Sequence, residues 1–289
     1  MGLPTLAIIN FTTTLPDNDV LEAIHAVNRQ ITENFIPIWG YGRTLMPFVP
    51  SFDAADPNEL AEERVPADSV IYLVNESSVP GALGFHDLNM GDVPFGFVFV
   101  LDPNDWTTTL SHEVLELILD PTANVLVPGP DPRDRRNTVL HTYEACDAVE
   151  RISYSIGAVD VSDFVTPSYF TLGEAAGSKN DFLGVGVPSF GATRGSHLAF
   201  LDLATGRFEQ ILGQHMPAQA RMVAKIETHD HPKPERPSEE TLARMASAMP
   251  LAARRGGGAA APPLRGITRT ARYREAAERV AGMMHAPQG

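Results

Sequence analysis

The chain is poor in cysteine, in positive charge and in long apolar runs. Its 289 residues include one cysteine, Cys146, so no intrachain disulfide can form and an oxidising compartment is not required. Asp and Glu number 36 against 22 Lys and Arg, and the formal net charge is −14. Such a surface repels phosphate backbones, so no nucleic-acid partner is expected. No stretch approaches the roughly 18 apolar residues of a membrane span, so no membrane association is expected either.

The beginning of the chain is apolar but has no basic segment ahead of its apolar run. Thr12, Thr13 and Thr14 follow directly, and a helical pattern comes after them. We therefore expect a first β-strand rather than a signal peptide, and a cytoplasmic or particle-associated soluble protein. The hydrophobic content of 43% is enough for one sizeable core.

Apolar periodicity predicts the elements of the first half of the chain. The expected strands are 6–11, 44–49, 69–74 and 94–101, and the expected helices are 17–35 and 106–119. Asp17 is predicted as the N-cap of the first helix and Pro37 as the residue that ends it, while Asp120-Pro121 ends the second. The order β-α-β-β-β-α predicts a compact α/β or α+β arrangement.

The second half of the main domain shows mostly strand signals. Residues 122–136 are rich in proline and charge and predict a loop, and 139–149 predicts a short strand or helix. Further strands are expected over 152–156, 164–170, 197–203 and 207–212, the last two joined as a hairpin by Ala204-Thr205-Gly206. We therefore expect an α+β domain over 1–228, divided into a strand and helix half (1–121) and a β-rich half (122–228).

The composition changes at about residue 229. Residues 229–289 contain prolines, then a Gly, Ala and Pro segment, and two stretches of helical periodicity. They predict a linker and a partly mobile helical tail, which is a candidate for binding a protein partner.

The chemistry is concentrated in the segment Ser-His-Glu-Val-Leu-Glu, from Ser111 to Glu116. His112 and Glu116 are four residues apart, so their side chains share one helix face and can converge on one point. An imidazole and a carboxylate that converge in this way present two metal ligands from one helix. Glu113 is rotated by about 100° from His112. In a metallopeptidase this is the position of the general base that takes a proton from metal-bound water.

A second group of candidate ligands follows at 141–147, with the sequence His-Thr-Tyr-Glu-Ala-Cys-Asp. Glu144 is the predicted third ligand, and Asp147 is the competing candidate. Asp147 can alternatively orient His112 without touching the metal. His141 is a further candidate, both as a ligand and as part of a cleft.

These elements resemble the zincin metallopeptidases in their order of strand, helix, strands and a helix with His-Glu-x-x. They are more similar to an uncharacterised bacterial and phage family with the pattern Ser-His-Glu-x-x-Glu-x-x-x-Asp-Pro followed by Glu-x-x-Asp. The matching residues here are Ser111, His112, Glu113, Glu116, Asp120, Pro121, Glu144 and Asp147. Segments 35–40, 84–87 and 161–164 also resemble that family, and the resemblance covers about residues 5–215.

The resemblance implies a zincin-like α+β fold: a mixed sheet with an N-terminal helix and a metal-site helix, followed by a β-rich part. It also implies a metal-dependent hydrolase, with Glu113 as base and a peptide or protein as substrate. Zincins have a second histidine where this chain has Glu116. Zn²⁺ accepts one histidine and two carboxylates, while Mn²⁺, Fe²⁺ and Ca²⁺ also suit such ligands. The resemblance therefore implies the metal site more firmly than the peptidase activity.

Each candidate residue also has a plainer interpretation. His112 and Glu116 can belong to a solvated helix face opposite the apolar positions of the same helix. His86-Asp87 can line a cleft beside the metal or form a turn. Cys146 fits a small buried residue better than a thiolate ligand. Asp120 is expected to cap or pair near the helix end, and His229-Asp230-His231 to have no specific role.

The bulky run 95–100 is expected in the core, with an edge that can pair with an extended peptide if it is exposed.

Two other functions remain open from the sequence. One is a structural or interaction protein on a zincin-like scaffold, such as a component of a phage or phage-like particle, in which a metal would link the Glu144 loop to the helix. The other is a binding module that uses a metal to hold a carboxylate or peptide without turnover. A closed coordination sphere would favour either of these over the hydrolase.

Overall fold

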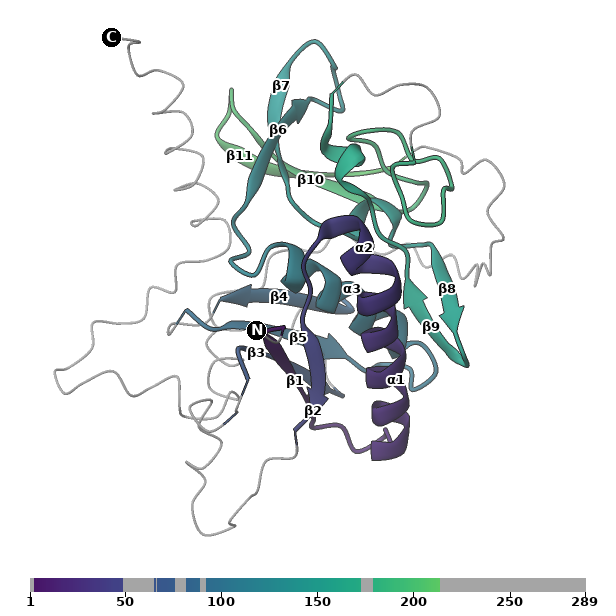
Figure 1. Cartoon of the computed structure of the whole chain (residues 1–289). Helices are drawn as coiled ribbons and strands as arrows, with labels where there is room; N and C mark the ends of the chain where they lie inside the picture. Colours follow the sequence, from purple (N-terminus) through teal and green to yellow (C-terminus); the bar gives the residue numbers. More distant parts are fainter. Residues whose placement is uncertain are drawn as a thin grey trace, which may run out of the picture.

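The computed structural model describes residues 3–48, 65, 67–75, 82–88, 92–172 and 179–213. In these residues α-helices lie against a five-stranded sheet, and a four-stranded sheet and a two-stranded hairpin follow (Figure 1). The predicted mixture of helix and sheet is therefore confirmed. The predicted linker and tail, with His229-Asp230-His231, lie outside the described residues. Among the helices that are described, none is long and apolar enough to cross a membrane.

The five-stranded sheet has the order β2-β1-β3-β5-β4. Its strands are β1 (Thr5–Asn10), β2 (Thr44–Pro47), β3 (Ser69–Val74), β4 (Gly84–Leu88) and β5 (Pro94–Phe99). All pairs are parallel except β4 with β5, which is antiparallel. The interpretation of His86-Asp87 as a turn is wrong, because both residues lie in β4. The run 95–100 has no free edge for peptide pairing, because β5 lies between β3 and β4 and the edge strands are β2 and β4.

Side chains of the central strands alternate between the two faces of this sheet. Leu6 and Ile8 join the main hydrophobic cluster under the helices, while Ala7 and Ile9 join a smaller cluster on the opposite face. The main cluster also includes Leu198, so both halves of the described chain share one core.

Helix α1 (Asp17–Arg29) begins without a side-chain cap. The residue before it is Pro16 in an extended conformation, and Asp17 is the first helical residue, so the predicted N-cap role of Asp17 is wrong. Asp17 and Asp19 nevertheless favour this end, because carboxylates in a first turn interact well with the helix dipole.

The first helix does not end before Pro37. After α1 the backbone continues as a π-helix (Gln30–Phe35) and then as α2 (Ile36–Trp39). Pro37 lies in the first turn of α2, where its missing N–H is not needed. The segment before it has π-helical i→i+5 bonding, as in the bond from the Ile36 N–H to the Ile31 carbonyl. The helix ends at Gly40, whose φ of 81° is left-handed and whose N–H donates to the Ile36 carbonyl.

The four-stranded antiparallel sheet has the order β11-β10-β7-β6. Its strands are β6 (Leu126–Pro130), β7 (Thr138–Thr142), β10 (His197–Asp202) and β11 (Arg207–Leu212). The predicted hairpin of β10 and β11 is confirmed. The predicted loop over 122–136 is partly wrong, because β6 forms within it. Prolines at 128 and 130 are tolerated because β6 is an edge strand, where an N–H can be missing.

Residues 147–170 contain several short elements. They are a 3₁₀ turn (Asp147–Val149), the hairpin of β8 (Ser153–Ile156) with β9 (Val159–Ser162), and a second 3₁₀ turn (Pro167–Phe170). The predicted strand over 164–170 is therefore wrong at its end. The large side chains of Phe164 and Tyr169 in this segment are buried in the main cluster.

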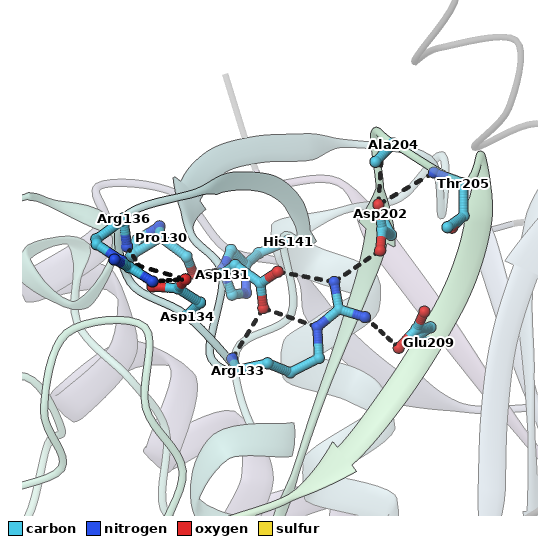
Figure 2. A network of polar contacts seen from close by, with 10 residues as sticks. All are labelled: Pro130, Asp131, Arg133, Asp134, Arg136, His141, Asp202, Ala204, Thr205 and Glu209. Atoms are coloured by element: carbon cyan, nitrogen blue, oxygen red, sulfur yellow. Dashed lines mark hydrogen bonds and ion pairs between the residues drawn. The ribbon is translucent and has the colours of Figure 1, made fainter.

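Arg133 ties the β6–β7 connection to the β10–β11 hairpin (Figure 2). Its guanidinium donates to Asp131, Asp202 and Glu209 at 2.6 to 2.9 Å and lies over the Phe200 ring. These side-chain hydrogen bonds, led by that to Asp131, raise the pKa of Arg133. Because Asp202 also accepts from the Ala204 and Thr205 N–H groups, one network fixes both turns of this sheet.

A pair of buried carboxylates lies where β9 meets the loop at 181–187. Asp181 accepts backbone hydrogen bonds from Val185 and Gly186. Asp163 is fully buried and accepts one bond from the Leu183 N–H, and its Oδ2 has no hydrogen-bond partner among the described residues. Burial and the charge of Asp181 raise the pKa of Asp163 to about 8. In an unfolded chain the pKa of an aspartate is about 3.9.

The raised pKa of Asp163 predicts a pH-dependent stability. The contribution of Asp163 is fully present below about pH 4 and is lost as the pH rises to about 8, because the unfolded chain releases this proton first. Asp163→Asn should therefore become more stable relative to wild type, by up to about 1.4 kcal/mol per pH unit across this window. Urea unfolding from pH 4 to 8 measures the difference. Asp160→Asn, on the exposed part of β9, is the control, and its free energy of unfolding should change with pH as that of wild type does. The same pH dependence in Asp163→Asn as in wild type would contradict the prediction.

Candidate metal centre

The helix that carries the motif is α3 (Trp106–Leu119), with the predicted bounds. It contacts β4, β5 and β9. Leu110 and Val114 are fully buried, as expected, but Glu113 and Glu116 are also buried, with 5% and 3% exposure. The interpretation of a solvated helix face is therefore wrong. Elements from both halves of the chain cover α3, and its acidic residues point into the protein.

A buried hydrogen-bond network fixes the rotation of α3. Ser111 Oγ donates to Gln30 Oε1 at 2.6 Å and accepts from the Ser162 N–H at 3.1 Å. Gln30 Nε2 donates to the Ser162 carbonyl at 2.8 Å. The network joins the π-helix, α3 and β9, so the residues that follow Ser111 are held in one orientation. Asp120 is the C-cap residue of this helix, as predicted, and its Oδ2 accepts from the Val125 N–H at 2.8 Å.

Glu116 joins α3 to the loop that carries the other candidate ligands. Its Oε1 accepts the backbone N–H groups of Cys146 and Asp147, at 3.1 and 3.2 Å. Its Oε2 points to the other side and lies 3.3 Å from His112 Nε2. One oxygen thus holds the loop while the other stays available to a cation. Hydrogen bonding of the second oxygen is the usual way in which a protein orients a ligating carboxylate.

Asp147 reaches the same imidazole nitrogen as Glu116. Its Oδ1 lies 3.3 Å from His112 Nε2, and Glu116 Oε2 lies at the same distance. Donors at about 2.0 to 2.2 Å from one tetrahedral ion lie about 3.3 to 3.6 Å from each other. The separations of His112 Nε2 from each of these two carboxylate oxygens agree with this ligand-to-ligand distance.

Glu144, the predicted third ligand, is buried and also lies close to this group. Its carboxylate, with those of Glu116 and Asp147, forms a set of atoms within 4.8 Å of one another. The structure thus brings together all four predicted ligands, with Asp147 in direct contact with His112 and Glu144 on the carboxylate side. Which of the two completes the coordination stays a prediction.

The buried charges of the site are balanced by histidines alone. Within the described part of the chain, Glu113, Glu116 and Asp147 have no salt bridge to lysine or arginine. Buried carboxylates need a paired cation or a proton. Although burial lowers it, the charge of Glu116 and the hydrogen bond to Asp147 raise the pKa of His112 well above its usual value. The cluster therefore favours a positive charge at the point where a metal would lie.

Glu113 turns toward the edge strand. Its Oε2 lies 3.5 Å from His86 Nδ1, and its chain occupies the space left by Gly84. A Cβ at Gly84 would lie 2.7 Å from Glu113 Oε1 and 2.9 Å from the Phe97 carbonyl, so only glycine leaves this room. Burial raises the pKa of Glu113, which is the direction that a proton acceptor working near neutral pH requires.

The other cleft and ligand candidates lie further from the centre. Asp87 is next to His86 in β4, so its side chain lies on the opposite face of the sheet. His141 is buried on β7 against Phe190, and its Nε2 is 2.9 Å from the Pro130 carbonyl. His141 lines a hollow that also contacts Glu144 and Asp147, but it belongs to none of the ligand groups of the described residues.

Cys146 lies at the centre as a buried thiol. It is fully buried and lies within 4.8 Å of ligand atoms of His112 and Glu116. Burial raises the pKa of the Cys146 thiol well above its usual value, which favours the neutral form. This agrees with the interpretation of a small buried residue.

Sequence reasoning missed two residues of the cluster, His197 and Glu150. His197 Nε2 lies 3.0 Å from Asp147 Oδ2, and His197 Nδ1 lies 2.9 Å from Glu150 Oε2. Burial opposes it, but the charge of His197 lowers the pKa of Asp147. His197 begins β10, 50 residues after Asp147, and no motif links the two positions. The spacing of Glu150, three residues after Asp147, was the only available signal.

Known proteins provide no further guide. No protein family, curated protein or solved structure matches this chain. The resemblance to zincins stays a prediction, and the case for a function depends on the geometry of the site.

The network at Ser111 gives a test of how the site is held. Ser111→Ala leaves Gln30 Oε1 and the Ser162 N–H without this partner in a buried place. We expect a loss of about 1 to 3 kcal/mol in the free energy of unfolding, measured by urea denaturation. Ser155→Ala, on the exposed face of β8, is the matched control and should change it by less than about 0.5 kcal/mol. Equal losses in both variants would contradict a role for the network.

Proposed function

We propose that this protein is a metal-dependent hydrolase of the metallopeptidase type with a zincin-like fold. The observation that carries the proposal is the position of His112 Nε2, 3.3 Å from both Glu116 Oε2 and Asp147 Oδ1, with Glu113 one residue away on the same buried helix. His112, Glu116 and Asp147 would hold the metal, with Glu144 beside them. Zn²⁺ suits this donor set, and Mn²⁺, Fe²⁺ and Ca²⁺ are the alternatives.

The residues around the centre would have separate roles in hydrolysis. A divalent cation supplies a Lewis acid and lowers the pKa of a coordinated water. Glu113 accepts the proton of the attacking water and returns it to the leaving amine, because its carboxylate is buried beside the centre and its pKa is raised. His197 holds Asp147 from the far side. The antiparallel edge strand β4 supports binding of an extended peptide or protein substrate.

Glu113→Gln tests the base. The variant keeps the size of the side chain but cannot accept a proton, so we expect the cation at His112 and Glu116 to be retained and hydrolysis to fall about 10²- to 10⁴-fold. The measurement combines metal analysis by mass spectrometry with cleavage of a fluorogenic peptide library. Glu22→Gln, on the outer face of α1, is the control and should keep full activity. Unchanged cleavage in Glu113→Gln with bound metal would rule out this role for Glu113.

A structural metal site is the second candidate, and one observation favours it. Glu116 already connects α3 to the 146–147 backbone, so a cation at this point would tighten the same link. In this case the protein would be a structural or interaction protein on the same scaffold, such as a component of a phage-like particle. Binding of a partner through the tail at 229–289 stays a prediction.

Chelation tests whether a bound metal stabilises the protein. A cation present at about 100 times its Kd stabilises the native state by about 2.7 kcal/mol. EDTA should therefore lower the melting temperature of wild type, and Zn²⁺ should restore it. His112→Ala should respond to EDTA less than wild type does, because it lacks a ligand of the proposed centre. His25→Ala, exposed on α1, should respond as wild type does. A wild-type melting temperature that ignores EDTA would contradict both candidate functions.

A further inference from the structure

His86 is a buried imidazole whose polar nitrogens make no hydrogen bond within the described part of the chain. Its side chain is 2% exposed, and neither ring nitrogen has a hydrogen-bond partner among the described residues. Leaving a buried polar group unpaired costs about 1 to 3 kcal/mol. A native structure keeps such a group when a ligand or ion satisfies it.

A second buried polar atom without a hydrogen-bond partner among the described residues lies beside the His86 ring. His86 Nδ1 faces Glu113 Oε2 at 3.5 Å, and Glu113 Oε2 also has no hydrogen-bond partner among the residues described. This separation is longer than the 2.7 to 3.2 Å of an N–H···O hydrogen bond. It agrees with the distance of about 3.3 to 3.6 Å between two ligands of one cation.

Glu116 supplies the third donor. Its Oε2 lies 3.7 Å from His86 Nδ1, and ligand atoms of His86, Glu113 and Glu116 lie within 4.8 Å of one another. All three residues are buried. Gly84 makes this arrangement possible, because any Cβ there would displace the Glu113 carboxylate.

We propose that His86, Glu113 and Glu116 bind a second divalent cation, beside the one held by His112, Glu116 and Asp147. The two positions have different histidines, His86 in one and His112 in the other. Glu116 Oε2 faces both histidines, at 3.3 and 3.7 Å, and is the shared ligand. Two-metal sites place their ions about 3.5 to 4 Å apart, which one carboxylate can bridge.

The second ion has a consequence for the proposed hydrolase, and this part of the inference rests on that function. A cation on Glu113 Oε2 occupies the oxygen that would accept the proton. Loading of the second position therefore inhibits hydrolysis, and activity passes through a maximum as the metal concentration rises.

Metal stoichiometry tests the second position without any activity. The full-length protein, stripped with chelator, is titrated with Zn²⁺ by calorimetry and then analysed for bound zinc by mass spectrometry. We expect two equivalents for wild type and one for His86→Gln, which keeps a polar side chain of similar reach. His86→Phe, an apolar replacement, should also bind one. His112→Ala should retain one equivalent, and His25→Ala, exposed on α1, should bind two.

Three outcomes separate this inference from the proposed function. One equivalent in wild type, unchanged in both His86 variants and lost in His112→Ala, would overturn the second position and leave the hydrolase intact. Two equivalents that fall to one in the His86 variants, without any hydrolysis, would support the second position and count against the hydrolase. No bound zinc in wild type would overturn both. Circular dichroism of each variant checks that it is folded.

Discussion

The buried carboxylate of Glu116 is the interaction on which the candidate centre depends. One of its oxygens accepts the N–H groups of Cys146 and Asp147, and the other faces His112 and His86. The first oxygen brings a loop from the β-rich half onto the helix, and the second creates the demand for positive charge. A histidine at this position, as in the zincins that the motif resembles, donates one hydrogen and cannot accept two backbone N–H groups in this way. The glutamate therefore makes the loop and the helix one unit.

Charge balance links the smaller features of the site. Glu113, Glu116 and Asp147 face three histidines, His86, His112 and His197. Glu144 and Glu150 add further negative charge to the cluster. Each histidine comes from a different element, β4, α3 or β10, so the cluster forms only when both sheets and the helix are in place. Stability and metal affinity are consequently coupled, since a cation that binds the assembled cluster stabilises the whole fold.

Local sequence was informative where one strong signal acted alone. The bounds of α3 followed from apolar periodicity and the Asp120-Pro121 stop, and the β10–β11 hairpin followed from its three-residue turn. Local signals were wrong where tertiary context compensated for them. Pro37 did not end the first helix because it lies in the first turn of α2, after the π segment, and the prolines of β6 did not prevent a strand because that strand is at an edge.

The sequence by itself determined the pair His112 and Glu116 and the helix that presents them, because a spacing of four residues fixes a shared face whatever surrounds it. Only the tertiary structure decided that this face is buried, that Asp147 contacts His112, and that His86 and His197 join the cluster. These contacts connect positions 27 to 50 residues apart, and long-range pairing of strands leaves no periodic trace in the chain. A helix motif is a local property, whereas a coordination sphere is closed by residues that the fold brings from elsewhere.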